Sequence, residues 1–129
     1  MKKDNIKVVL CEPGKCAKIA DIDSSLEGLQ AAVGGLIEAM YPFDESVCII
    51  RNEEDKINGM ELNRAIKDEG KVVDIIAGPF FVCGCNTESF SSLTAEQQKT
   101  YLQMFQYPEI FMRCGGEVLS IPYNPNHEI

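Results

Sequence analysis

The chain has 129 residues, of which 45% are hydrophobic and 25% are charged, a composition that excludes a disordered or collagen-like protein and predicts one globular domain over residues 1–129. Twenty Asp and Glu outnumber twelve Lys and Arg, which gives a formal net charge of −8. Because nucleic-acid binding depends on neutralising phosphates, this excess of acidic residues argues against direct contact with DNA or RNA.

The first elements that the sequence predicts are two strands. Residues Ile6–Cys11 are rich in β-branched side chains and end at the turn pair Pro13-Gly14. Apolar residues then alternate over Cys16–Ile22, which predicts a second strand. The two segments together predict a β-hairpin.

A long helix is predicted over residues 24–40. Ser24 and Glu27 match a capping box, and apolar residues follow at three- and four-residue steps. Gly34 and Gly35 fall inside this predicted helix, where each glycine costs about 1 kcal/mol relative to alanine. Two interpretations would offset that cost: close packing of the helix on a strand, or a bare backbone surface that receives a ligand.

The rest of the chain predicts further strands separated by helices. Strands are expected at Ser46–Arg51, Val72–Ala77, Phe80–Cys85 and Glu117–Ile121, and helices at Glu61–Lys67, from Thr94 onward, and at Pro108–Arg113. The pair Gly78-Pro79 predicts a bend between two strands, because proline donates no hydrogen bond to a strand ladder. Thr94 and Gln97 form a second capping box, and residues 122–129 are expected to be irregular.

This order of elements predicts an α+β fold with a mixed, mostly antiparallel sheet and two main helices packed on one face. A hairpin followed by a helix and further strands also resembles the β-grasp order. That topology stays open as an alternative.

The cysteines and the apolar runs indicate a soluble, cytoplasmic protein. No segment has the length of a signal peptide's apolar region or of a transmembrane helix, so we expect no membrane contact. The six cysteines are then expected to remain thiols, most of them buried as small hydrophobic side chains. We expect Cys83 and Cys85 to point to opposite faces of a strand, which argues against a metal site. A thiol or metal protein that acts through Cys83, Cys85 and other cysteines stays open as a third hypothesis.

No catalytic constellation is recognisable. The single histidine, His127, lies in the C-terminal tail, so a serine or cysteine nucleophile has no obvious base. Phosphate-binding and hydrolase motifs are also missing from the sequence. We therefore predict no catalytic residue, no metal and no cofactor.

The missing catalytic groups favour a non-catalytic protein that acts by contact with another protein. The alternative is a small-ligand or nucleotide-binding domain with weak or no enzymatic activity. Its candidate residues are Gln30, Gly34, Gly35, Asn52, Glu53, Asn63 and Arg64. The glycine backbone and the polar side chains would line one concave pocket. In the competing interpretation, Asn63 and Arg64 are exposed positions on a short helix and the glycine pair is a packing contact.

Residues 26–38, with the sequence LEGLQAAVGGLIE, resemble the LE-x-LQ-x-x-VGG-x-IE segment of a small family of bacterial, phage and conjugative-element proteins, the domain of unknown function 3846. Weaker motifs of the same family follow in the same order: Asn52-Glu53-Glu54, Asn63-Arg64, Asp74-Ile75-x-x-Gly78 and Ser92-Leu93-Thr94-x-Glu96-Gln97. The resemblance implies an accessory protein of a phage or mobile genetic element and supplies no catalytic residue. We expect such a protein to act by contact with another protein.

Overall fold

Six antiparallel strands form the main sheet of the computed structural model, which describes residues 5–54, 59–86 and 89–126. Five of them lie side by side in the order β2-β1-β7-β4-β3, and β8 pairs with β7. The bounds are β1 (Asn5–Cys11), β2 (Lys18–Asp23), β3 (Ile37–Met40), β4 (Val47–Asn52), β7 (Phe80–Cys85) and β8 (Phe90–Ser91). The predicted first hairpin is confirmed, since Val8 and Ala20 are partners in the antiparallel pair of β1 and β2.

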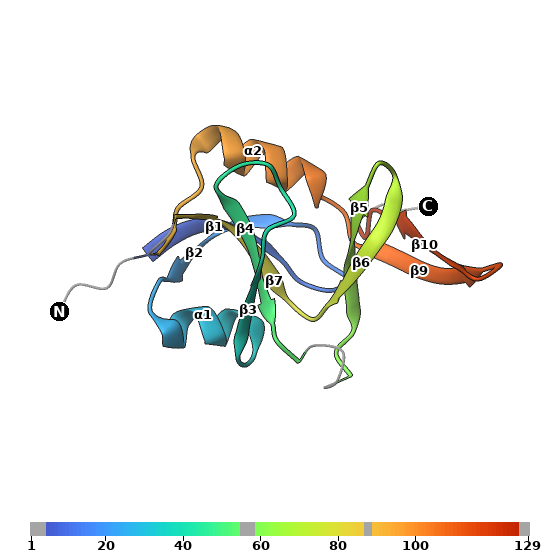
Figure 1. The fold of residues 1–129 in the computed structure, drawn as a ribbon, viewed down its shortest axis with the longest axis horizontal. Coiled ribbons are helices and arrows are strands. Elements are labelled where there is room, and N and C mark those ends of the chain that lie inside the picture. Colours follow the sequence, from blue (N-terminus) through green and yellow to red (C-terminus); the bar gives the residue numbers. More distant parts are fainter. Residues whose placement is uncertain (1–4, 55–58, 87–88, 127–129) are drawn as a thin grey trace.

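Two helices cover opposite faces of this sheet (Figure 1). Helix α1 (Leu26–Val33) packs Leu29 and Val33 on one face, in a cluster with Phe81. Helix α2 (Ala95–Met104) packs on the other face, where its Tyr101 joins Val82. Successive residues of a strand point to opposite faces, so one apolar strand serves both clusters.

The α+β class and the mostly antiparallel sheet are confirmed, but the prediction that both helices share one face is wrong. The central strands are apolar at successive positions, as expected for strands that are buried on both faces. A β-grasp order would require a parallel central pair, and every strand pair in the described ranges is antiparallel.

Helix α1 is much shorter than predicted, because the glycine pair ends it. Gly34 adopts a left-handed conformation with φ of 80°, and the backbone N–H groups of Gly34 and Gly35 both donate to the Gln30 carbonyl. This arrangement is a common helix C-cap, and glycine adopts it without steric cost. The residues after it form β3 instead of two further helical turns. At the other end, Ser25 caps the helix in place of the predicted Ser24.

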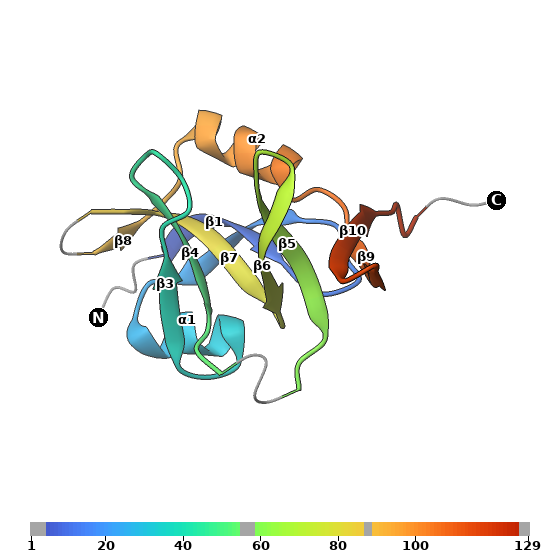
Figure 2. The ribbon, with the colours of Figure 1, turned by 45° about the vertical axis from the view of Figure 1, so that its right-hand side comes forward.

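Two hairpins are attached to the main sheet (Figure 2). One joins β5 (Leu62–Asp68) to β6 (Lys71–Ala77), and the other joins β9 (Glu109–Cys114) to β10 (Glu117–Pro122). The helices predicted at Glu61–Lys67 and Pro108–Arg113 are therefore wrong, since β-strand pairing outweighs local helix propensity there. Both glycines of the Gly115-Gly116 turn have positive φ, as a two-residue hairpin turn requires.

Other local predictions are confirmed. Thr94 and Gln97 form the expected capping box, with Thr94 Oγ1 accepting from the Gln97 N–H at 3.1 Å. Gly78, with φ of 73°, bends the chain between β6 and β7. Among the described residues, no helix is long and apolar enough to cross a membrane.

Candidate functional site

Five of the predicted ligand residues meet where helix α1 ends and β4 ends. Asn52 is buried there, with its Nδ2 donating to the Val33 carbonyl at 3.3 Å and its Oδ1 accepting from the Glu54 N–H at 2.7 Å. A Cβ atom added at Gly35 would stand 2.8 Å from Asn52 Nδ2. The close-packing interpretation of the glycine pair is thus confirmed at Gly35, which leaves room for the Asn52 amide.

Gln30 and Glu53 belong to the same junction through their backbones. The Gln30 carbonyl accepts the two glycine N–H groups, and the Glu53 N–H donates to the Leu36 carbonyl at 2.8 Å. The Glu53 side chain is exposed. The junction therefore holds the end of α1 against the β3–β4 pair.

Asn63 and Arg64 lie on β5 and are buried, so the prediction that they are exposed helix positions is wrong. Asn63 Nδ2 donates to the carbonyls of Cys11 at 3.0 Å and Gly78 at 2.8 Å. Asn63 Oδ1 accepts from Arg64 Nη1 at 2.6 Å. The Asn63 side chain thus connects β1, β5 and the bend before β7.

The Arg64 guanidinium is an internal connection between distant segments. Its Nε donates to the Phe105 carbonyl at 3.1 Å and its Nη2 to the Lys15 carbonyl at 2.7 Å. Burial lowers the pKa of Arg64 from its ordinary value, while the nearby Glu109 carboxylate acts in the opposite direction. Arg64 therefore ties β5 to the loop after β1 and to the end of α2.

The two groups of predicted residues are close in space but are separated by Met60. A Cβ atom at Gly34 would lie 3.7 Å from Met60 Cε, and the same side chain lies against Gly78. The groove between β6 and β10 and the cavity between β5 and the end of α2 are lined by other residues. A ligand site at Gln30, Gly34, Gly35, Asn52, Glu53, Asn63 and Arg64 remains a prediction.

Three cysteines cluster on the α1 face of the sheet. Cys83 and Cys85 share this face because residues two positions apart in a strand point the same way, so the expectation of opposite faces was wrong. Cys48 Sγ lies 3.7 Å from Cys83 Sγ, and this hydrogen bond, followed by burial, raises the pKa of the Cys48 thiol. Burial likewise raises the pKa of Cys11 to about 12. Within the described ranges, no group of three or more His, Cys, Asp or Glu could hold a metal ion, and His127 lies outside those ranges.

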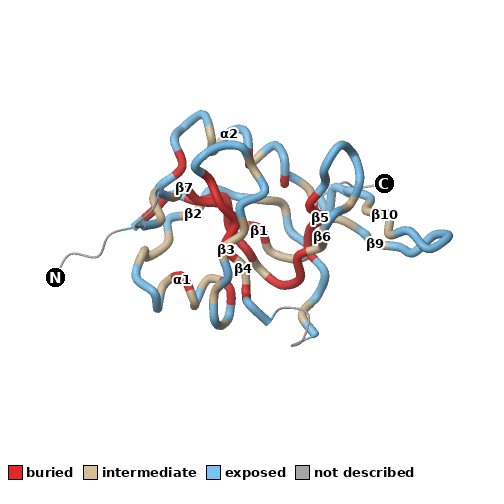
Figure 3. The backbone as a smooth tube through the Cα atoms, in the orientation of Figure 1, coloured by how far each residue is buried: buried red, intermediate tan, exposed pale blue. Residues whose placement is uncertain are grey.

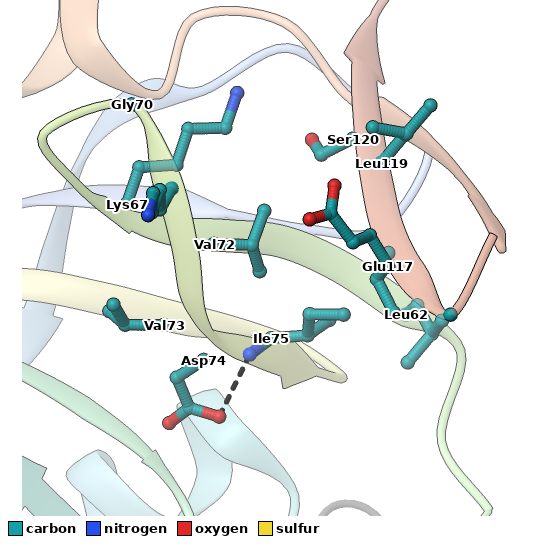
Figure 4. A pocket seen from close by; sticks show the side chains of 13 residues that line it. Leu62, Lys67, Gly70, Val72, Val73, Asp74, Ile75, Glu117, Leu119 and Ser120 are labelled. Carbon is teal, nitrogen blue, oxygen red and sulfur yellow. Dashed lines mark hydrogen bonds between the residues drawn. The ribbon is translucent and has the colours of Figure 1, made fainter. Parts of the chain in front are cut away.

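A groove of about 740 Å³ lies between β6 and β10 (Figure 4). Residues 70–75 form one wall and residues 116–120 the other, with Leu62 and Lys67 completing the lining. A second cavity of about 310 Å³ lies between β5 and the end of α2. No sequence pattern pointed directly to the groove, because both of its hairpins include a strand that was predicted as a helix.

The charged side chains of the groove differ in their partners. Asp74 Oδ2 accepts from Arg51 Nη1 at 3.0 Å, and Asp74 Oδ1 accepts from the Ile75 N–H at 2.8 Å. Lys67, Lys71 and Glu117 have no ion-pair partner within the part of the chain that the structure describes. In Figure 4, Lys67 and Glu117 lie on opposite sides of the groove.

The β9–β10 hairpin exposes an uninterrupted apolar row. Ile110 pairs with Ile121 and Met112 with Leu119, so all four side chains share one face of the hairpin. These side chains are between 41% and 53% exposed. Figure 3 shows that the hairpin is mostly exposed, in contrast to the central strands. We call these four residues the apolar face of the hairpin.

These features define an α+β protein built on a six-stranded antiparallel sheet, with two hairpins attached and a groove between them. The chain belongs to the family of the domain of unknown function DUF3846, whose model matches residues 6–106. No curated protein and no solved structure shows a significant match to the chain. The family match ends before β9, so the β9–β10 hairpin lies outside the matched residues.

Proposed function

We propose that this chain is a cytoplasmic, non-catalytic accessory protein that acts by contact with another protein. The apolar face of the β9–β10 hairpin is the observation that carries this proposal. The association with a phage or a mobile genetic element rests on the sequence resemblance given above. The acidic net charge favours a protein partner over a nucleic acid.

The apolar face has the composition of an interaction surface. Contiguous exposed apolar side chains with a polar border mark protein contacts more often than isolated ones do. Glu117, two positions before Leu119 on β10, lies exposed on the same face and provides a polar end to it. Each square ångström of apolar surface that a partner covers contributes roughly 25 cal/mol. Covering this face would therefore stabilise both the complex and the hairpin, since a two-stranded hairpin alone is marginally stable.

The second candidate is a small-ligand or nucleotide-binding domain. The volume of the β6–β10 groove favours it, because sites for small molecules commonly measure about 300–1,000 Å³. At the residues predicted from the sequence, however, the buried Asn52, Asn63 and Arg64 side chains already bond to protein groups.

Affinity capture with the full chain as bait tests the contact function. The variant Ile110→Thr/Ile121→Thr removes two apolar side chains from the hairpin and keeps β-branched residues there. The matched control, Ile19→Thr/Leu36→Thr, changes two exposed apolar residues elsewhere. We expect the wild type and the control to retain one bacterial protein that the hairpin variant loses, with circular dichroism showing that all three are folded.

Two outcomes would contradict this function. One is equal capture by the hairpin variant, because the apolar face would then be dispensable. The other is tight, salt-sensitive binding of the wild-type chain to DNA in a mobility-shift assay, which would indicate that phosphates are the partner.

A further inference from the structure

The cavity between β5 and the end of α2 combines apolar side chains with two side chains of opposite charge. It measures about 310 Å³, near the lower end of the range of small-molecule sites, which is about 300–1,000 Å³. Four segments that are distant in the sequence line it: residues 42–43 between β3 and β4, residues 65–67 of β5, residues 104–105 at the end of α2, and Glu109 at the start of β9 (Figure 2). A cavity of this volume suits a small metabolite better than a nucleotide.

The apolar part of the cavity is held in place by the core. The ring of Phe105, which is 3% exposed, packs edge-to-face on Phe80 with 5.4 Å between the ring centroids. Phe43 packs on Tyr101 with 4.8 Å between the centroids. Met104 is 53% exposed, so an apolar group that enters the cavity covers surface that otherwise contacts water. The cavity therefore offers a preformed contact to a hydrophobic side chain.

The two charged side chains of the cavity do not pair with each other. Glu109 Oε1 accepts from the Ala65 N–H at 2.8 Å and from Ser120 Oγ, whereas Glu109 Oε2 has no bonding partner among the described residues. Lys67 has no ion-pair partner in those ranges either, although it lies on β5 two positions after Ala65. One carboxylate oxygen and one ammonium group in this cavity are thus available to a ligand.

The surrounding charges require a ligand that carries both signs. Helix α2 ends at the cavity without a basic residue in its last turn, so its partial negative charge adds to that of Glu109 and attracts a cation. The buried Arg64 interacts electrostatically with Glu109 from the interior, and Lys67 is also positive, so an amine alone would meet repulsion. A carboxylate alone would be repelled by Glu109. A molecule with an ammonium and a carboxylate group matches both ends of this arrangement.

We propose that this cavity binds a free α-amino acid with an apolar side chain. The ammonium group of the ligand donates to Glu109 Oε2, and its carboxylate accepts from Lys67 Nζ. Its side chain contacts Phe43, Met104 and Phe105, which line the same cavity. This inference rests on the second candidate function, a small-ligand-binding domain, and does not require the contact function.

Titration of the full chain with L-leucine and with L-phenylalanine tests the inference. Calorimetry measures the affinity, and amide chemical shifts locate the site. We expect at least one of the two amino acids to bind and to shift the amides of Phe43, residues 65–67 and Phe105. Glycine should bind at least about tenfold more weakly, because it has no side chain to cover the apolar part of the cavity.

Truncated ligands separate the two charges. The amino acid that binds better is compared with its analogue without the amino group and with its analogue without the carboxylate. These are isocaproate and isoamylamine for leucine, or hydrocinnamate and phenethylamine for phenylalanine. Each analogue should bind about tenfold more weakly than the amino acid, because it leaves one charge of the protein unpaired.

Two variants assign each charge of the ligand to its protein residue. Glu109→Gln keeps an oxygen that accepts from the Ala65 N–H; it should weaken the amino acid about tenfold and should not weaken the carboxylate analogue. Lys67→Gln should weaken the amino acid about tenfold and should not weaken the amine analogue. The matched controls, Glu117→Gln and Lys71→Gln, change exposed residues outside the cavity and should leave every affinity within about twofold.

Circular dichroism establishes that the variants are folded. If Glu109→Gln does not fold, Lys67→Gln and the truncated ligands still test the proposal, because Lys67 is exposed. A residue with a merely structural role would weaken the amino acid and both analogues equally, so equal losses in a charge variant would overturn the assignment.

Two further results would overturn it. One is the absence of binding by either amino acid at millimolar concentration. The other is a set of amide shifts confined to residues 70–75 and 116–120, which would leave a small-ligand function in the β6–β10 groove. The Ile110→Thr/Ile121→Thr variant should bind the amino acid normally. Absence of amino-acid binding, while the hairpin variant still loses its captured protein, would overturn the cavity ligand and leave the contact function standing.

Discussion

The central sheet and the β9–β10 hairpin are both antiparallel, yet only the sheet has its apolar side chains covered on both faces. Phe81 lies under α1, and Val82, the next residue, lies under α2. In the hairpin, Ile110 and Met112 face outward with no layer of the described chain above them. The same strand chemistry thus produces a core in one region and an exposed surface in the other, depending on what packs above it.

The family match follows the same division. It includes every strand of the main sheet and both helices, and it stops before the hairpin. The packed core is therefore the part of this chain that the family model describes. The hairpin adds an exposed surface to that core, which is why the proposed contact function is assigned to it.

The largest expected difference between the two regions is in the reactivity of their thiols. Cys114 is exposed at the end of β9, whereas Cys11 and Cys48 are buried. Burial raises the pKa of Cys11, and the hydrogen bond with Cys83, followed by burial, raises the pKa of Cys48. Iodoacetamide reacts with the thiolate, so we expect Cys114 to be alkylated about a thousandfold faster or more. Mass spectrometry of the digested protein measures the rates. In concentrated urea the three cysteines should react at similar rates. Similar rates in the native protein as well would contradict the contrast between the buried core and the exposed hairpin.

Truncating one side chain in the sheet and one in the hairpin compares the contributions of the two regions to the free energy of unfolding. Phe81→Ala should lower the free energy of unfolding by about 3–5 kcal/mol, because it removes a fully buried side chain and leaves a cavity. Met112→Ala should change it by no more than about 0.5 kcal/mol, since this side chain is half exposed. Urea unfolding followed by circular dichroism gives both values. Equal losses would show that the hairpin belongs to the core.

Removal of the Arg64 side chain tests how the β5–β6 hairpin is held to the core. Arg64→Ala leaves the buried Phe105 carbonyl and the Lys15 carbonyl, whose hydrogen bond is partly buried, without a donor, and we expect a loss of about 3 kcal/mol. Lys67→Ala on the same strand is the control and should cost less than about 0.5 kcal/mol. Urea unfolding again measures the difference. A neutral effect of Arg64→Ala would mean that these hydrogen bonds add nothing to stability.

The smallest expected effect is a pH dependence at the junction of α2 with the main sheet. Hydrogen bonds donated by Tyr101 and then by Gln97 lower the pKa of Glu45. This stabilisation is complete above the unfolded pKa of about 4.3 and is lost as the pH falls through the folded value. We expect the urea midpoint to fall more steeply below about pH 5 in the wild type than in Glu45→Gln. Tyr101→Phe should also flatten the dependence of the urea midpoint on pH. Parallel pH profiles for the wild type and both variants would refute the assignment of this effect to Glu45.

Features that a few neighbouring residues determine could be predicted from the sequence. The Thr94 capping box and the β1–β2 hairpin are local patterns, and both were correct. The helix end at Gly34 was missed because the apolar residues after it repeat at helical spacing, although they form an edge strand. Glycines followed by a short apolar run are compatible with a continued helix or with a strand, and only the pairing of β3 with β4 decides between the two.

The candidate sites were harder to predict, because their residues act through distant partners. Arginine is seldom buried unless it is paired, and two of the partners of Arg64 are carbonyls 41 and 49 positions away along the chain. Lys67 and Glu117 come together only when two separate hairpins lie side by side. The Gly115-Gly116 pair between two apolar runs was the one local signal for the second hairpin.

The carboxylate that caps the Ile75 amide also has a consequence for self-assembly. A long bare strand margin is a template on which identical molecules can stack into insoluble fibres. With Asp74 anchored by Arg51, that margin is interrupted after a few residues. The interruption denies other copies of the molecule a continuous strand edge on which to polymerise.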